Sequence, residues 1–191
     1  MINRTNFFDT IRPTLFKNGF SQLQVDSIDA ILDECEAQGI TDKRQIAYIF
    51  ATPYHECYNP HRPQTRITPI KEYGSSQYLQ SKKYYPYIGR GFSGLTWKSN
   101  YEREGERLGI DLVTNPDMLL DINIAANSHV FCMKHGRYTG RKLSDYINGT
   151  MCNFMGARKI INGIDKAELI AGYARSFLAG LSSANSPQPQ H

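Results

Sequence analysis

The chain lacks several features that would place it in other classes of protein. Its 191 residues hold no apolar stretch long enough to cross a membrane and no Lys/Arg block of the kind that forms a nucleic-acid-binding arm. The cysteines form no C-x-x-C pair and no ligand-like cluster with histidine, which argues against a structural zinc site. We therefore expect a globular domain with no stable membrane insertion, no nucleic-acid partner, no cofactor and no metal.

The sequence also has little that resembles a secretion signal. Asn3, Arg4, Asn6, Asp9 and Arg12 interrupt any hydrophobic run near the N-terminus. We expect synthesis in the cytoplasm without a signal peptide, so that any target outside the cytoplasm is reached by another route. Reduced thiols fit this expectation, and two disulfides stay open if the protein matures in an oxidising space. The cysteines concerned are Cys35, Cys57, Cys132 and Cys152.

The composition is that of one ordinary globular domain with a raised aromatic content. Hydrophobic residues make up 40% of the chain and charged residues 21%, which is typical of a protein with a single core. The formal net charge of +4 favours encounter with an anionic polymer. There are 12 Tyr, 9 Phe and 1 Trp. These aromatics either pack in the core and on the surface or line a cleft, and composition alone leaves both open.

The hydrophobic periodicity near the N-terminus predicts helices. Apolar residues recur at helical spacing after Ser21, where Ser21 and Gln24 are placed to form a capping box. A second helix is predicted from Thr41 towards Glu56. Pro53 removes one helical hydrogen bond, and we interpret it as marking the end of that helix rather than a bend within it.

The rest of the chain alternates between irregular and helical patterns. Residues 58–101 are rich in Pro, Gly, Tyr and Lys and have no long period, which predicts a small irregular or β lobe. Helical patterns resume over 115–136 and again after Asp165. We therefore predict a mainly α architecture in which a helical body and the lobe flank a cleft. The single domain spans 1–181, and the polar tail 182–191 is expected to be flexible.

The segment 84–101 mixes aromatic rings, glycines and hydrogen-bonding side chains. Flat rings stack on sugar rings and polar groups bind hydroxyls, so this mixture suits a carbohydrate cleft. Glycines beside Arg90 let the backbone approach a ligand, with Arg90 as a donor. Thr96 could orient a water molecule and Asn100 could bind a sugar substituent. A tight turn followed by a helix cap explains the same residues without a ligand.

Two acidic residues could supply the chemistry of glycosidic bond cleavage. That reaction uses one carboxylic acid to protonate the leaving oxygen and a second carboxylate to activate water. Glu56 follows an apolar helix, which suits an acid that must hold a proton. Glu72 is the only acidic residue between Glu56 and Glu102. Either carboxylate could instead be a solvated surface group.

Several motifs taken together resemble glycoside hydrolase family 19, and within it the chitinase-like endolysins of bacteriophages and prophages. The matching residues are Tyr54-His55-Glu56, Gly89-Arg90-Gly91, Leu95-Thr96-Trp97 and Asn100-Tyr101. Further stretches similar to the phage branch are Pro69–Gly74, Leu108–Asp117 and Ala157–Gly163. The resemblance spans roughly residues 40–180.

The resemblance implies a lysozyme-like, mainly α-helical fold and inverting hydrolysis. Carried over by motif, the catalytic residues are Glu56 as general acid, Glu72 as general base and Thr96 as the residue that helps to hold the water. Asn100 is similar to a substrate-binding Asn of the family. The full set of predicted substrate-binding residues is His55, Tyr87, Arg90, Trp97, Asn100, Tyr101 and Asn162.

The resemblance also orders the possible functions. The first prediction is a monomeric endolysin that cuts the β-1,4 bonds of peptidoglycan at the cell wall of a bacterial host. The alternatives are a chitinase that acts on chitin oligomers and a degenerate protein that binds cell-wall glycan without cutting it. One departure from the family bears on this choice, because Gly94 stands where the family usually has Gln.

Overall fold

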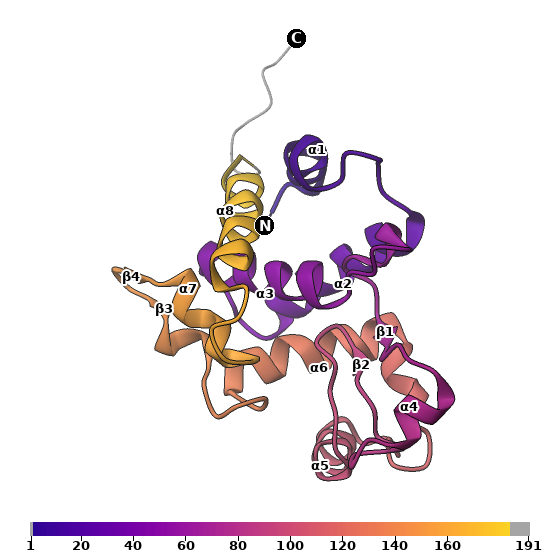
Figure 1. Ribbon diagram of the computed structural model, residues 1–191. Helices are drawn as coiled ribbons and strands as arrows, with labels where there is room; N and C mark the ends of the chain where they lie inside the picture. The colour runs from indigo at the N-terminus through magenta and orange to yellow at the C-terminus, as the bar shows by residue number, and fades with distance from the viewer. Residues whose placement is uncertain (1, 184–191) are drawn as a thin grey trace.

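The computed structural model describes residues 2–183, which fold into a mainly α-helical structure (Figure 1). The α-helices in this range are α1 (Arg4–Leu15), α2 (Gln22–Ala37), α3 (Lys43–Glu56), α4 (Ser76–Gln80), α5 (Lys98–Leu108), α6 (Ile122–His135), α7 (Phe154–Ala157) and α8 (Ala167–Ser183). Short 3₁₀ helices are η1 (Pro63–Thr65), η2 (Pro116–Leu120), η3 (Leu143–Asp145) and η4 (Arg158–Ile160).

The strands of the described region form two small antiparallel pairs. Strand β1 (Ile70–Lys71) pairs with β2 (Arg90–Gly91), and β3 (Ile147–Asn148) pairs with β4 (Met151–Cys152). In the first pair, Ile70 lies opposite Gly91 and Lys71 opposite Arg90. The predicted mainly α fold with a small irregular and β lobe is confirmed.

The helical body is built around α3. Helix α8 packs against α3, α1 and α7, while α2 packs against α6. Figure 1 shows α4 and α5 of the lobe on the far side of α6 from α1 and α8, and β2 of the lobe packs against α6. The main hydrophobic cluster draws buried residues from all five long helices of the body, among them Phe7, Ile31, Phe50, Val130 and Phe177. A second, smaller cluster in the lobe comprises Leu95, Tyr101, Leu112 and Leu119.

Local sequence signals account for most helix boundaries. The predicted capping box of α2 is present: the Gln24 amide donates to Ser21 Oγ (3.2 Å) and the Ser21 amide donates to Gln24 Oε1 (3.0 Å). The predicted helix over 115–136 is divided into η2 and α6, because Asp121 caps a new helix by accepting from the amides of Asn123 and Ile124. This side-chain cap competes with continuation of the first helix.

The predicted tail 182–191 is only partly covered by the structure, which describes the chain as far as residue 183. The predicted flexible tail begins too early, because Ser182 and Ser183 belong to α8. The remainder of the predicted tail, 184–191, lies outside the described residues.

Within residues 2–183 no helix has both the length and the hydropathy required to cross a membrane. All four cysteines are free, with Cys152 exposed and the others buried.

Candidate active site

Glu56 is the last residue of α3, and its side chain is 27% exposed. The expectation that Pro53 ends the helix is wrong, since α3 continues to Glu56. A proline in this position leaves the Ile49 carbonyl without its helical donor. His129 of α6 replaces that donor, because its Nε2 lies 2.9 Å from the Ile49 carbonyl oxygen. The helix can therefore extend by the residues that carry Glu56.

His129 connects the helix of the candidate acid to the loop after β2. Its ring is 1% exposed, and its Nδ1 lies 2.8 Å from Ser93 Oγ. Burial lowers the pKa of His129 to about 4, although the hydrogen bond to Ile49 acts in the opposite direction. The neutral ring therefore donates from Nε2 to Ile49 and accepts at Nδ1 from the Ser93 hydroxyl. Sequence reasoning missed this residue.

Arg158 is the principal partner of Glu56. Its Nη1 donates to Glu56 Oε1, and its Nε donates to the Asp165 carbonyl at 3.0 Å. The Arg158 side chain is 5% exposed, so the ion pair is closed off from solvent on the arginine side. Glu56 Oε2 accepts no hydrogen bond from any residue in 2–183, which leaves one carboxylate oxygen for a ligand.

Glu72 directly follows strand β1 in the lobe and is fixed by hydrogen bonds rather than by an ion pair. Oε1 accepts from the Tyr84 hydroxyl (2.9 Å), and Oε2 accepts from the Gly89 amide (3.0 Å). The Glu72 amide donates to the Gly89 carbonyl at 2.7 Å. Burial and the bond to Glu72 raise the pKa of Tyr84 to about 12, so the hydroxyl keeps the proton that it donates. Each carboxylate oxygen retains acceptor capacity for a water molecule.

Tyr84, which bonds Glu72, belongs to a pair of aromatic rings on the lobe. Tyr84 packs edge-on against Trp97, with ring centroids 5.4 Å apart. Trp97 is 48% exposed and has a φ of 73°, which is rare for a bulky residue. Backbone strain of this kind often accompanies functional sites. An exposed indole that packs on the ring bonded to Glu72 has the chemistry needed to stack on a sugar ring.

Thr96 and Asn100 lie together at the start of α5. Asn100 Nδ2 donates to the Thr96 carbonyl at 2.7 Å, and both residues are half-buried. The Thr96 hydroxyl makes no hydrogen bond to a residue in 2–183, so it is free to hold water. The predicted roles of Thr96 in holding water and of Asn100 in binding substrate stay predictions.

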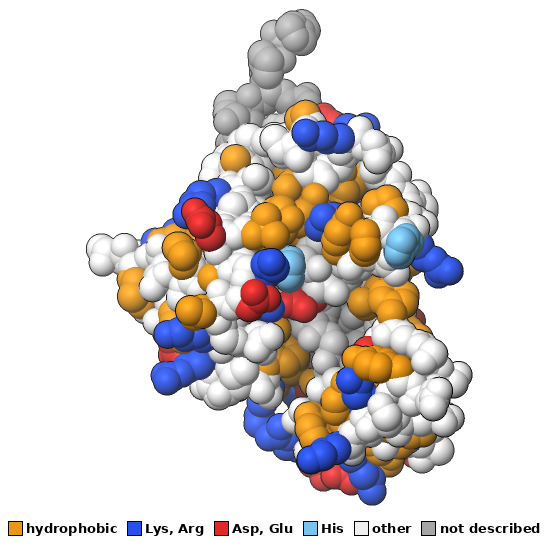
Figure 2. Space-filling model, in the orientation of Figure 1, with side chains coloured by type: hydrophobic (Ala, Val, Ile, Leu, Met, Phe, Trp, Pro, Cys, Tyr) orange, Lys and Arg blue, Asp and Glu red, His pale blue; other side chains and the backbone are white. Residues whose placement is uncertain are grey.

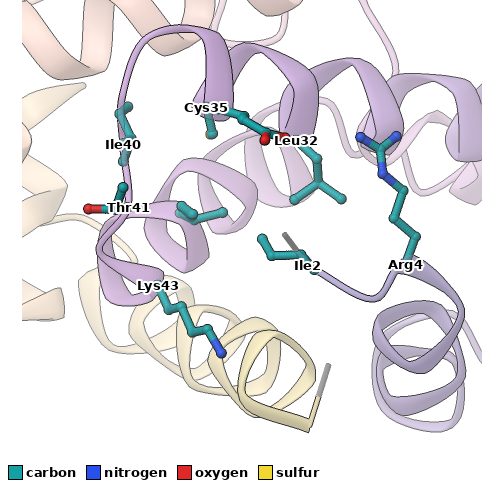
Figure 3. A pocket seen from close by; sticks show the side chains of 9 residues that line it. Ile2, Arg4, Leu32, Cys35, Ile40, Thr41 and Lys43 are labelled. Atoms are coloured by element: carbon teal, nitrogen blue, oxygen red, sulfur yellow. The ribbon is translucent and has the colours of Figure 1, made fainter. Parts of the chain in front are cut away.

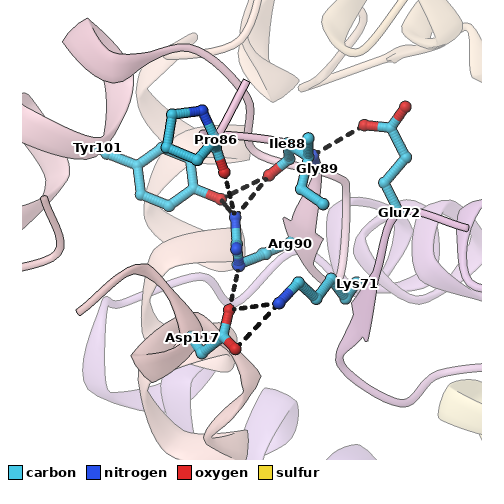
Figure 4. Close-up of polar contacts among 8 residues, drawn as sticks. All are labelled: Lys71, Glu72, Pro86, Ile88, Gly89, Arg90, Tyr101 and Asp117. Carbon is cyan, nitrogen blue, oxygen red and sulfur yellow. Dashed lines mark hydrogen bonds and ion pairs between the residues drawn. The ribbon is translucent and has the colours of Figure 1, made fainter. Parts of the chain in front are cut away.

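Arg90 and Tyr101 were expected to bind substrate directly, but the structure gives them a supporting role (Figure 4). Arg90 is 4% exposed and donates to Asp117 (2.6 Å), to the Pro86 and Ile88 carbonyls and to the Tyr101 hydroxyl. Tyr101 is fully buried and donates to the Ile88 carbonyl at 2.6 Å. Their polar atoms are used inside the protein, where they hold the backbone next to Gly89.

The outer end of this network reaches solvent through Asp117. Lys71 Nζ also contacts Asp117 at 3.0 Å, so β1 and β2 are tied to η2 through one carboxylate. Burial works against ionisation, but the hydrogen bonds from Arg90 and Lys71 prevail and lower the pKa of Asp117. The network thereby fixes the hairpin that carries Glu72 and Gly89.

The remaining predicted residues occupy both sides of the site. His55 precedes Glu56 and is half-buried; burial lowers its pKa, Glu56 acts in the opposite direction, and Arg158 and Arg66 lower it further. Asn162 is exposed, and its backbone N–H donates to the Arg158 carbonyl at 3.0 Å. Tyr87 is half-buried against Tyr101, with ring centroids 5.3 Å apart. Asn162 is thus linked to Glu56 through Arg158.

Gly94 occupies a turn that favours glycine. The amide and carbonyl of Leu95 pair with those of Arg90, so residues between them must reverse direction. Gly94 has a φ of 66°, and a Cβ atom there would meet nothing within 4 Å. The backbone conformation, rather than a lack of space, therefore accounts for glycine at this position.

A groove separates the body from the lobe on the face shown in Figure 2, with acidic, basic and histidine side chains gathered beside it on the body. Glu56 belongs to the body and Glu72 to the lobe. A separate cavity of about 280 Å³ lies at the N-terminal end of α3, among residues such as Ile2, Leu32 and Lys43 (Figure 3). At about 1.5 Å per residue along α3, that cavity is far from Glu56. Within residues 2–183, no cluster of His, Cys, Asp or Glu is arranged to hold a metal ion.

Solved structures share this lysozyme-like helical architecture. The chain matches chitinase C from Streptomyces griseus with a TM-score of 0.66 and 20% identity, over 95% of this chain and 78% of that chain. It also matches a bacterial family 19 chitinase with a TM-score of 0.56 and 18% identity, over 100% of this chain and 98% of that chain. At such identities the likeness shows the fold alone.

Sequence comparison identifies the family. The profile of glycoside hydrolase family 19, described as chitinase class I, matches residues 36–138, which is more than half of the chain. Endochitinase 1 from Theobroma cacao is 35% identical over 92 residues, 41% of this chain and 29% of that protein. Chitinase 11 from Oryza sativa is 56% identical over 34 residues, 18% of this chain and 13% of that protein. The chain thus spans less than a third of the length of these curated relatives. Because the family profile matches more than half of the chain, the chain belongs to glycoside hydrolase family 19.

Proposed function

We propose that the chain is a glycosidase that cleaves β-1,4 bonds between N-acetylated aminosugars, and that its substrate is peptidoglycan. The observation that carries this proposal is the placement of two differently held carboxylates, Glu56 at the end of α3 and Glu72 beside strand β1. One lies in the body and the other in the lobe, with the groove of Figure 2 between these two parts. Family membership supports the same reaction class.

The residues can divide the reaction as an inverting mechanism requires. Glu56, half-buried and held by Arg158, protonates the leaving oxygen. Glu72, held by Tyr84 and Gly89, accepts a proton from a water molecule that the Thr96 hydroxyl helps to orient. Trp97 offers a face for a sugar ring. The water then attacks the anomeric carbon as the bond from that carbon to the protonated leaving oxygen breaks, so the two carboxylates act on opposite sides of the reacting bond.

Peptidoglycan is proposed as the substrate on two grounds. The sequences of Pro69–Gly74 and Ala157–Gly163 resemble phage endolysins, and the second stretch contains Arg158, the partner of Glu56. The net charge of +4 favours an anionic polymer over a neutral one. The names of the curated relatives favour the second candidate, a chitinase. Under the endolysin hypothesis, the protein acts as a monomer at the cell wall of a bacterial host.

Digestion of purified peptidoglycan and of chitin oligomers by the wild type, Glu56→Gln and Glu72→Gln tests the proposal. We expect muropeptide release by the wild type and a loss of about 10²-fold to 10⁴-fold in each variant. Glu106→Gln, on an exposed part of α5, is the matched control. Cleavage of chitin oligomers alone would establish the chitinase, and glycan binding without product from the wild type would establish a non-catalytic protein.

A further inference from the structure

A second cavity lies beside the C-terminal end of α3. Its volume is about 650 Å³. It opens to solvent and is bordered by the connection between α1 and α2, the start of α2, the end of α3 and the segment around η1. Among the lining residues are Phe16, Lys17, Phe20, Tyr54, Tyr58 and Arg66.

Arg66 lines this cavity and is stacked between aromatic rings. Its guanidinium carbon lies 4.1 Å from the ring centroid of Tyr54 and 3.7 Å from that of Tyr58. Nη1 donates to the Tyr54 carbonyl at 2.6 Å, and no Asp or Glu within residues 2–183 forms a salt bridge with it. Stacking covers the faces of a guanidinium and leaves the N–H groups at its edge available. Arg66 is therefore prepared to bind a planar anion such as a carboxylate.

The backbone around Arg66 is held in place from two directions. Gln24 Nε2 donates to the Arg66 carbonyl at 3.0 Å. The next residue, Ile67, is fully buried with a φ of 51°, an unusual conformation for a β-branched side chain. Such strain persists only where surrounding contacts enforce it. The position of the guanidinium is thus fixed before any ligand arrives.

The charge of the lining selects for an anion with some apolar surface. Lys17 and Arg66 are the charged residues of the lining, and it includes no Asp or Glu. Phe16, Phe20 and Tyr58 add aromatic surface. A neutral sugar polymer has no group that would use the two cations, whereas an acidic peptide has both carboxylates and apolar side chains.

The cavity is lined by chain neighbours of the candidate acid, although not by Glu56 itself, and it is built largely by a part of the chain that the family profile does not match. Tyr54 and Tyr58 flank Glu56 in the sequence, on either side of the end of α3. The lining residues from Thr14 to Gln24 precede the matched segment, which begins at residue 36. The N-terminal helices thereby add a wall beside a site that the family segment already contains.

We propose that this cavity binds the acidic peptide that peptidoglycan carries on its sugars and that chitin lacks. The inference rests on the proposed function, since it names the part of the substrate that the Arg66 cavity recognises. Arg66 is near enough to His55, the residue before Glu56, to lower its pKa in addition to the larger effect of burial, and an extended peptide gains roughly 3.3–3.6 Å per residue as it leaves a sugar bound near Glu56. Arg66 binds a stem carboxylate and Lys17 contributes attraction at the rim.

Direct binding of the free stem peptide tests the cavity independently of catalysis. We expect the wild type and Glu56→Gln to bind it equally in calorimetric titration, and Arg66→Gln to bind about tenfold more weakly. Arg62→Gln, an exposed arginine of the same segment, is the matched control. Lys17→Gln, at an exposed site in the α1–α2 connection, should weaken peptide binding severalfold. This variant keeps the proposal testable if Arg66→Gln does not fold.

Kinetics on two forms of the same glycan complete the test. The ratio of KM for peptide-free strands to KM for stem-bearing strands should be about ten for the wild type and about one for Arg66→Gln. Absence of peptide binding, or competition by inorganic phosphate as strong as that of the peptide, would overturn the stem-peptide assignment. Peptide binding without glycan cleavage by the wild type would instead overturn the proposed hydrolase function and leave the binding site in place.

Discussion

The helical body and the lobe hold their candidate carboxylates in different ways. In the body, Glu56 ends a helix that is surrounded by the main hydrophobic cluster, and a single buried arginine, Arg158, pairs with it. In the lobe, Glu72 follows a two-residue strand, and hydrogen bonds from Tyr84 and Gly89 hold it. The smaller apolar cluster of the lobe leaves more of its geometry to polar contacts.

This difference predicts which property, activity or local stability, a substitution in each region should change. A change that disturbs α3 is resisted by extensive packing, so its effect should concentrate on the orientation of Glu56 and on activity. A change in the Arg90 network removes much of what fixes the hairpin of the lobe, so its effect should appear first as local loosening. The two regions therefore predict separable signatures in activity, stability and hydrogen exchange.

Replacement of Arg158 by Met should have the largest effect. It removes the partner of Glu56 and the donor to the Asp165 carbonyl. We expect glycan cleavage to fall about 100-fold, because a small displacement of a reacting group is costly. The free energy of unfolding should fall by about 2 kcal/mol. Reducing-end assays and urea denaturation measure the two effects, with Lys159→Met, the exposed neighbour, as control.

Unchanged activity in Arg158→Met would mean that packing alone positions Glu56. The body would then need no polar support at its carboxylate, and the contrast with the lobe would become sharper. A loss of stability without a loss of activity would contradict the positioning role of Arg158.

Replacement of Arg90 by Met should loosen the lobe. The substitution removes donors to Asp117, to the Tyr101 hydroxyl and to two backbone carbonyls. We expect a loss of about 2 kcal/mol in the stability of the lobe. Faster hydrogen exchange should appear at the Glu72 amide, while amides of α8 keep their protection. Lys83→Met, exposed on the same lobe, should change neither, and equal loosening of lobe and body would contradict the separation.

The pH dependence of stability should report on His129, which links the two regions. Its folded pKa, about 4, lies below the usual 6.5, so the unfolded chain binds the extra proton between these values. Stability from the neutral ring is complete above pH 6.5 and is lost as the pH falls towards 4. Between pH 6.5 and 5 we expect a loss of about 1.5 kcal/mol. Denaturation of wild type and His129→Gln across this range measures it.

The comparison with His129→Gln isolates this one group, because His55 and His135 titrate in both proteins. Gln can still donate to the Ile49 carbonyl but does not take up a proton in this range. The variant should therefore lose part of the wild-type slope. An identical slope in both proteins would show that His129 does not carry the pH dependence.

The local parts of the fold and site could be predicted from the sequence, and the long-range parts could not. The capping box at Ser21 and Gln24 and the position of Glu56 near a helix end involve residues close in sequence. The Glu56–Arg158 pair joins residues 102 positions apart, and the Ile49–His129 bond joins residues 80 apart. The prediction that Pro53 ends α3 fails for this reason, since a distant side chain, His129, replaces the missing hydrogen bond.

The predicted roles of Arg90 and Tyr101 show the same limit within the site. Their motif lies at the site, but a motif does not reveal whether a side chain points to the ligand or supports the backbone behind it. Both side chains are buried in the network of Figure 4. Tyr84, by contrast, was part of the aromatic segment without an assigned role, and it bonds Glu72 directly.

The smallest predicted effect comes from a pair of glycine substitutions with opposite signs. Gly94→Ala in the lobe should destabilise the protein by about 1 kcal/mol, because its φ of 66° is unfavourable for a residue with a Cβ atom. Gly172→Ala within α8 should stabilise it by about 0.5–1 kcal/mol, because alanine favours the helix. Neither Cβ would meet an atom within 4 Å, so packing is constant across the pair. Urea denaturation of both variants measures the signs, and a stabilising Gly94→Ala would show that the turn of the lobe relaxes without strain.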